Sequence, residues 1–237
     1  MKGKSQQHLM RVGFEGHTLV GDVLSDGTPP QLLVLHGAGN SCRQRFQPLR
    51  EELWAAGIST AAFDFVGHGD TGGDLKSSSL SSRTRQACRF VDALNLQQPL
   101  ALMGASMSAY TAVKLLEHYR IKSLILLVPA MYAARAYTIP FNRGFSDIIR
   151  QPQSWLRSDA WRILAGYRGR LLIVAAEEDR VIPRDVITRI YDSAVNSAER
   201  ELYIAPKASH FVFTDLRTGN PEEFQYIFDR IRQKLRV

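Results

Sequence analysis

A serine near the middle of this chain of 237 residues stands where a nucleophile would be placed. Ser106 lies in Gly104-Ala105-Ser106-Met107-Ser108, between an apolar run that predicts a strand and a pattern that predicts a helix. A sharp turn between strand and helix lifts a serine hydroxyl above the sheet edge, beside the free N–H groups of the helix N-terminus. Because Ser108 stands at the second glycine of G-x-S-x-G, the motif by itself favours the simpler interpretation that Ser106 caps the helix.

A base and an acid that would activate this serine occur near the end of the chain. A serine hydroxyl becomes a good nucleophile when a histidine takes its proton, and that histidine needs an acid to orient it. His210 follows the last predicted strand, and Asp179 follows the strand before it. Since the carboxyl ends of parallel strands meet at one sheet edge, we predict that both residues lie near the serine. Glu177 and Glu178 are neighbours that compete with Asp179 for the role of the acid.

The other five histidines suit structural roles better. His8 and His17 belong to a predicted hairpin far from that edge, and His118 lies late in a helix, where we expect it to face solvent. His36 and His68 are at the ends of predicted strands, where we expect each ring to bond backbone groups in a turn. The histidine after the last strand is therefore the candidate base.

The segments that must position these residues alternate between strand and helix. A hairpin is predicted at 8–15 and 17–24, and Asn220-Pro221-Glu222-Glu223 predicts the start of the last helix. Between them, predicted strands at 31–35, 58–65, 100–104, 122–128, 171–176 and 200–205 alternate with predicted helices at 40–54, 80–94, 107–119 and 184–195. This order predicts an α/β fold, with a mostly parallel central sheet and helices on both faces. The length suits a single domain over residues 1–237.

Residues 131–168 interrupt the alternation and are predicted to form a small cap, since long irregular loops often cover active sites. The segment contains seven aromatic residues. Phe141, Phe145, Trp155 and Trp161 among them are candidates for an acyl pocket, and packing of the cap onto the body is an equally good interpretation. The cap also has six arginines against two acids, and we favour the interpretation that these arginines face water over binding of an anionic substrate group.

Five parts of the sequence together resemble the α/β-hydrolase superfamily, and the similarity runs over nearly the whole chain. They are Leu35-His36-Gly37-Ala38-Gly39, Asp64-Phe65-Val66-Gly67-His68-Gly69, the segment around Ser106, Asp179 and His210. The sequence is most similar to the monoglyceride-lipase and serine-aminopeptidase-like (lysophospholipase-like) branch, which shares His-Gly-Ala-Gly and a methionine after the nucleophile.

The resemblance implies roles for particular residues. It implies an α/β-hydrolase fold with an oxyanion hole made of the backbone N–H groups of Ala38 and Met107. It favours Asp179 as the acid, because the family places that residue four positions before a proline, here Pro183. The sequence differs from the family at Ser108, where a glycine lets helix and strand approach closely, and we expect a small change in packing there.

These observations predict a serine hydrolase that cleaves a small or medium acyl ester through an acyl-enzyme, without a metal or an organic cofactor. The same residues would also serve an acyltransferase, a thioesterase or an amidase, because the fold does not determine the bond. A relative without catalytic activity that binds a small hydrophobic ligand or a protein partner is the alternative from another class. The complete serine, aspartate and histidine set argues against it.

Composition limits the partners. The net charge is +7, yet no run of five Lys or Arg residues and no nucleic-acid motif occurs, so we predict a small acyl substrate, no nucleic acid and at most weak contact with a membrane surface. The sequence contains no run of 18 apolar residues, so no transmembrane segment is predicted. The two cysteines and the lack of a signal-peptide pattern predict a cytoplasmic protein, and no feature indicates the oligomeric state.

Overall fold

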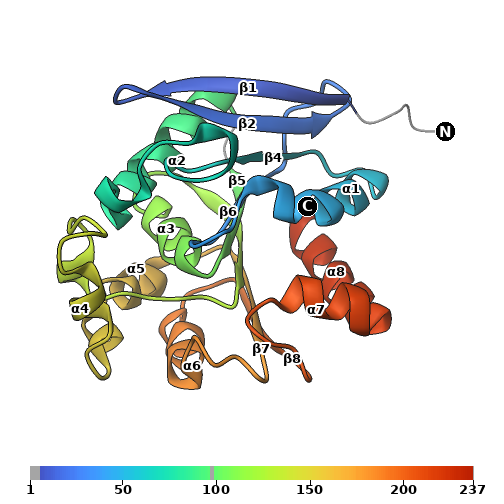
Figure 1. Cartoon of the computed structure of the whole chain (residues 1–237). Helices are drawn as coiled ribbons and strands as arrows, with labels where there is room; N and C mark the ends of the chain where they lie inside the picture. The colour runs from blue at the N-terminus through green and yellow to red at the C-terminus, as the bar shows by residue number, and fades with distance from the viewer. Residues whose placement is uncertain (1–5, 97–98, 237) are drawn as a thin grey trace.

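The computed structural model describes residues 6–96 and 99–236, which form an eight-stranded sheet with helices on both faces (Figure 1). The strand order is β1-β2-β4-β3-β5-β6-β7-β8. β1 (Gln6–Phe14) and β2 (His17–Ser25) form the antiparallel hairpin, and β2 also pairs antiparallel with β4 (Thr60–Phe63). The other pairs are parallel, and involve β3 (Leu32–Leu35), β5 (Leu100–Ala105), β6 (Ile121–Leu127), β7 (Arg170–Ala176) and β8 (Glu199–Ala205). The predicted fold class is confirmed.

Two layers of helices cover the sheet, and each layer has its own hydrophobic core (Figure 1). Strand side chains alternate between the layers: Leu33 and Leu35 of β3 belong to one core, and Leu32 and Val34 to the other. α1 (Gln47–Ala55), α7 (Val212–Gly219) and α8 (Pro221–Leu235) lie on one face. The other face carries α2 (Leu80–Leu94), α3 (Met107–Leu115), α4 (Phe145–Ile149), α5 (Ala160–Gly166) and α6 (Arg184–Ser193).

Local sequence explains why the main helices begin and end where they do. The Ser79 hydroxyl accepts the N–H of Ser82 at the start of α2, and Asn95 ends that helix in the left-handed conformation. The Asn220 side chain caps α8 by accepting the N–H of Glu223, and Pro221 occupies its first turn. α8 then buries the predicted apolar stripe of Phe224, Ile227, Phe228, Ile231 and Leu235.

Four segments differ most from the predicted elements or add to them. α1 begins at Gln47, seven residues after the predicted start, because the 3-10 turn Arg43–Phe46 precedes it. α3 ends at Leu115, four residues before the predicted end, and its last residues continue as turns. α7 was not predicted, although its residues follow the candidate base directly. The segment between β6 and β7 contains only α4, α5 and the short 3-10 turns Ala134–Ala136 and Ser154–Arg157. Within the described ranges, the helices are all too short or too polar to cross a membrane.

Candidate active site

The turn that carries Ser106 has the geometry of a nucleophile elbow. β5 ends at Ala105 and α3 begins at Met107, so Ser106 alone makes the turn, with φ 50° and ψ −117°. This positive φ is strained for a residue with a Cβ, and such strain is typical of functional sites. A Cβ on Gly104 would lie 2.5 Å from the Ser108 carbonyl oxygen, so only glycine lets strand and helix meet this closely.

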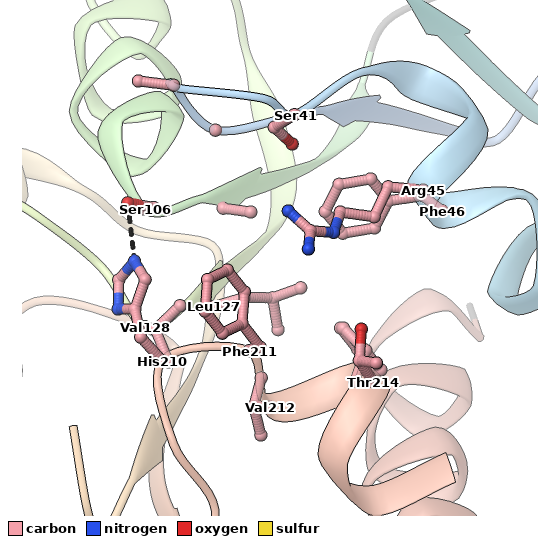
Figure 2. A pocket seen from close by; sticks show the side chains of 14 residues that line it. Ser41, Arg45, Phe46, Ser106, Leu127, Val128, His210, Phe211, Val212 and Thr214 are labelled. Atoms are coloured by element: carbon pink, nitrogen blue, oxygen red, sulfur yellow. Dashed lines mark hydrogen bonds between the residues drawn. The ribbon is translucent and has the colours of Figure 1, made fainter. Parts of the chain in front are cut away.

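The structure brings the three predicted residues Ser106, His210 and Asp179 together at the carboxyl edge of the sheet. The Ser106 Oγ lies 3.0 Å from the His210 Nε2, a contact drawn in Figure 2. The His210 Nδ1 lies 2.8 Å from the Asp179 Oδ2. The loops after β5, β7 and β8 supply the three side chains, as their order in the chain requires. This arrangement can pass a proton from the hydroxyl to the imidazole while the carboxylate holds the ring.

Backbone groups fix the carboxylate of Asp179. Its Oδ1 accepts the N–H groups of Val181 at 2.8 Å and Ile182 at 3.0 Å, which leaves Oδ2 for His210. Burial raises the pKa of Asp179, but the hydrogen bonds from His210 and from the two backbone N–H groups outweigh it and hold the pKa below its ordinary value. The competing Glu177 is exposed and accepts the N–H of Lys207, away from the imidazole.

The candidate oxyanion loop lies directly against the serine. A Cβ on Gly37 would lie 3.3 Å from the Ser106 Cβ, so the loop backbone passes the nucleophile closely. Ala38 follows in this loop and lines the same cavity as Ser106. Met107 is the first residue of α3, and an N–H at a helix N-terminus has no acceptor within the helix. Both predicted oxyanion residues thus belong to segments that adjoin Ser106.

A buried arginine that was not predicted from the sequence holds this loop. Arg83 is fully buried in α2, and its Nη2 donates to the carbonyls of His36 at 2.9 Å and Gly37 at 3.1 Å and to the Ser108 hydroxyl at 2.8 Å. Among the residues that the structure describes, no carboxylate pairs with Arg83, and burial lowers its pKa to about 9. Its guanidinium instead lies 3.8 Å from the centre of the Phe65 ring.

Ser108 takes part in the same contact. Its hydroxyl accepts from Arg83 and donates to the His36 carbonyl, so the side chain occupies the space between helix and loop. The expected change in packing is thus a polar bridge between α3 and the oxyanion loop. His36 is a turn histidine, because its Nε2 accepts the Phe65 N–H and its Nδ1 contacts the Gly37 carbonyl.

The cavity at Ser106 differs from the predicted acyl pocket. It lies between the oxyanion loop and the start of α7, and it is lined mostly by apolar side chains (Figure 2). The lining includes Phe46, Leu127, Val128, Phe211, Val212 and Phe213, together with Arg45 and the hydroxyls of Ser41 and Thr214. The cap residues Phe141, Phe145, Trp155 and Trp161 are not among them, and neither are the cap arginines.

The four cap aromatics pack the cap instead. Phe141 meets Phe145 edge to face, with ring centres 4.8 Å apart, and Trp155 meets Trp161 in the same way at 6.1 Å. Phe145 and Trp161 are buried in the core beneath α2 and α3, and Phe141 and Trp155 pack against that core. In Figure 1 the cap helices lie on the α3 side of the molecule, whereas α7 lies on the α8 side. The cavity at Ser106 therefore does not include the four cap aromatics, and an acyl pocket in the cap stays a prediction.

Polar contacts tie the cap to the body. The Asp159 carboxylate, just before α5, accepts the hydroxyl of Tyr110 at 2.6 Å and the ammonium of Lys114 at 3.0 Å, both from α3. The Arg162 guanidinium pairs with Glu117 at 2.9 Å.

In the described part of the chain, no cluster of His, Cys, Asp and Glu has the arrangement of a metal site.

Comparisons with known proteins agree with the fold. A family model described as serine aminopeptidase, S33, matches residues 29–158. A search of curated protein sequences gives no match. Among solved structures, the chain is similar to an esterase from Pyrococcus furiosus, with 17% identity over 98% of this chain and 94% of that one and a TM-score of 0.72.

Two further solved structures are similar over nearly their whole length. An esterase from Exiguobacterium antarcticum has 16% identity over 98% of this chain and 100% of that one, with a TM-score of 0.72. The thioesterase domain from the curacin biosynthetic pathway has 17% identity over 95% of this chain and 99% of that one, with a TM-score of 0.69. At such identities the likeness shows the fold alone.

Proposed function

The chain belongs to the serine aminopeptidase S33 family of α/β hydrolases, and from this premise we propose that it is a serine hydrolase that cleaves a small or medium acyl ester. The observation that carries the proposal is the pair of contacts from Ser106 to His210 at 3.0 Å and from His210 to Asp179 at 2.8 Å. A hydroxyl, an imidazole and a buried carboxylate in this order form the set that acyl transfer needs.

In the proposed mechanism, the Ser106 Oγ attacks the carbonyl carbon while its proton moves to the Nε2 of His210. The backbone N–H groups of Ala38 and Met107 stabilise the negative oxygen of the tetrahedral intermediate. His210 then gives the proton to the leaving alcohol, and an acyl-enzyme remains on the serine. Water, activated by the same imidazole, releases the acid and restores the hydroxyl. Asp179 holds the ring and stabilises its charged form throughout.

The cavity supports an ester with a small or medium acyl part. Its volume is about 90 Å³, and Leu127, Val128 and Phe211 give it apolar walls beside the serine. Such walls bind alkyl or aryl groups through the burial of apolar surface. The chemistry requires no organic cofactor, because nucleophile, base and oxyanion donors all come from the chain.

Fluorophosphonate labelling tests the proposal, because the probe reacts with an activated serine and leaves other serines untouched. We expect the wild-type protein to be labelled on Ser106 and to hydrolyse 4-nitrophenyl acetate or butyrate. Ser106→Ala should lose both properties, with a fall of roughly 10⁴-fold in kcat. Ser77→Ala, at an exposed serine far along the chain from the site, is the matched control and should behave like the wild type.

The substrate panel should also contain a thioester and an amino-acid anilide. If the thioester or the anilide is hydrolysed faster than the matched ester, the proposed bond that the enzyme cleaves changes, but the proposed mechanism stays the same. A folded wild-type protein that is not labelled and cleaves none of the three would support the relative without catalytic activity instead.

Where the protein acts is part of the same proposal. Cys42 and Cys88 are both free thiols, which suits a reducing compartment such as the cytoplasm. The net charge of +7 suits weak contact with anionic lipid. Co-sedimentation with phosphatidylserine vesicles at low and high salt tests that contact, because screening would abolish it.

A further inference from the structure

We propose that Arg45 recognises an anionic group of the substrate, so that the ester cleaved at Ser106 carries a carboxylate or a phosphate. The inference rests on the proposed function and narrows its substrate class. Arg45 lies in the 3-10 turn Arg43–Phe46 just before α1 and lines the cavity that contains Ser106 and His210. Its guanidinium points into the space between Ser106, Phe211 and Thr214 (Figure 2).

The charge of Arg45 is not neutralised by the protein. Among the described residues, no carboxylate lies within ion-pair distance of its guanidinium. Neighbouring arginines are different: Arg43 is buried and pairs with Asp22, Asp64 and Asp70. Arg50 is also buried and pairs with Asp22 at 2.5 Å. Arg43 of this turn is thus paired with carboxylates in the body of the protein. Arg45 of the same turn lines the cavity and has no carboxylate partner among the described residues.

An aromatic ring fixes where this free charge lies. The Arg45 guanidinium carbon is 4.9 Å from the centre of the Phe211 ring, and Phe211 directly follows the base His210. A cation over a ring face is attracted to it and keeps its N–H groups at the edge of the plane free to donate. Arg45 is therefore held at the wall of the cavity with its donors available.

Among the described residues that line the cavity, Arg45 is the only lysine, arginine, aspartate or glutamate. The walls are apolar, and the hydroxyls of Ser41 and Thr214 are the side-chain donors that accompany Arg45. A guanidinium and hydroxyls match the oxygens of a carboxylate or phosphate, and the exposure of Arg45 lets such a group reach it from solvent. An adjoining groove shares Arg45 and Thr214 and adds Arg217, so the positive potential extends away from the serine.

Two pairs of esters test the proposal, each pair differing only in one charge. The first pair is the 4-nitrophenyl ester of glutaric acid and that of monomethyl glutarate, which differ at the end of the acyl chain. The second is 4-acetoxyphenylacetate and its methyl ester, which differ on the leaving group. We expect kcat/KM to be roughly 10-fold higher for the charged member in at least one pair. 4-Acetoxyphenyl phosphate, compared with 4-acetoxyphenylacetate, distinguishes a preference for phosphate from one for carboxylate.

The measured quantity is the ratio of kcat/KM between charged and neutral members. In Arg45→Gln the ratio should fall to about 1, and Arg45→Lys should retain part of it, because a point charge attracts without the two-pronged geometry. Arg120→Gln is the matched control: it removes the same charge at an exposed residue just before β6, at the opposite edge of the sheet, and should keep the wild-type ratio. Sodium chloride at high concentration should lower the wild-type ratio and leave that of Arg45→Gln unchanged.

A wild-type ratio near 1 in both pairs, or an undiminished ratio in Arg45→Gln, overturns the inference. A ratio that depends on a cap arginine instead, tested with Arg143→Gln, also overturns it. These outcomes are distinct from failure of the proposed function, in which neither neutral ester is hydrolysed and Ser106 is not labelled.

Discussion

Ser108 stands where related hydrolases have glycine, and its hydroxyl bridges α3 to the oxyanion loop through Arg83 and the His36 carbonyl. Removing it takes an acceptor from a fully buried guanidinium. We therefore expect Ser108→Ala to lower the free energy of unfolding by about 1–3 kcal/mol. Ser108→Gly should cost up to about 1 kcal/mol more, because glycine weakens a helix. Urea unfolding measures both changes.

The opposite result for Ser108 is equally informative. If Ser108→Gly is as stable as the wild type or more stable, the residue common in the family is better here too, and the bridge adds nothing. The difference in stability between Thr188→Ala and Thr188→Gly, at an exposed position of α6, gives the cost of glycine in a helix where no buried contact is lost.

Asp179 is expected to act through the imidazole it holds. Asp179→Asn offers an amide whose N–H₂ group cannot accept the Nδ1–H, so the ring adopts the wrong tautomer and kcat should fall by roughly 10⁴-fold. Glu178→Gln removes the same charge one residue away and should change kcat little, since its side chain is exposed. Steady-state hydrolysis of 4-nitrophenyl butyrate measures both. Should Glu178→Gln abolish activity while Asp179→Asn stays active, the acid has been assigned to the wrong residue.

At the level of single residues, the sequence predicted those whose position in the chain determines their position in space. Ser106, Asp179 and His210 each follow a strand of a parallel sheet, so their meeting follows from topology alone. Arg45 and Arg83 were missed because their roles depend on burial and on partners distant in sequence. Nothing in the local sequence distinguishes the paired Arg43 from the free Arg45 two residues later.

At the level of elements, periodicity predicted the strands and long helices well, and irregular segments poorly. α2 has the predicted bounds, and α8 buries the predicted stripe, because capping residues and apolar spacing are local properties. α7 was missed although Ser209, just before it, accepts the Phe211 N–H and donates to Asp215 in its first turn. The aromatic residues of the cap do pack against one another. Their number in the sequence, however, does not indicate on which side of Ser106 the cap lies.

The packing of these elements predicts different consequences for two aromatic residues. Trp161 is buried in the cap, so Trp161→Ala should cost about 3–5 kcal/mol of stability and lower activity in parallel on acetate, butyrate and octanoate esters. Phe211 lines the cavity and is 54% exposed, so Phe211→Ala should cost little stability and change the preference among the three esters. Thermal unfolding and kcat/KM for each ester measure both. If only Trp161→Ala changes the preference among the three esters, the acyl pocket lies in the cap.

Across the whole molecule, buried charges at the β4 side of the sheet are compensated by partners from several elements. Arg43 and Arg50 gather Asp22 of β2 and Asp64 beyond β4, and this network anchors the start of α1 to the hairpin edge. At the far edge, Lys234 of α8 pairs with Glu199 and Glu201 of β8. Two buried histidines, His36 and His68, have ring centres 4.8 Å apart.

These two histidines predict how the stability of the entire molecule depends on pH. Burial lowers the pKa of His36 well below its ordinary value, and nearby Arg83 lowers it further, although Asp64 lies 3.9 Å from the ring. Burial and Arg83 also lower the pKa of His68. Below a pH of about 6.5 the unfolded chain therefore binds protons that the folded chain does not. The free energy of unfolding should be constant with respect to these groups above that pH and fall as the pH decreases, by at most about 1.4 kcal/mol per pH unit for each histidine.

Urea unfolding at pH 5, 6, 7 and 8 measures this dependence, and the slope between pH 5 and 6.5 is the quantity to compare. His36→Asn keeps a hydrogen-bonding group near Nδ1 but cannot take up a proton, so its slope should be smaller than that of the wild type, whatever its absolute stability. His118→Gln removes an exposed histidine and should keep the wild-type slope. An unchanged slope in His36→Asn would mean that this ring binds a proton equally well in the folded and unfolded chains, which its burial in the oxyanion loop does not allow.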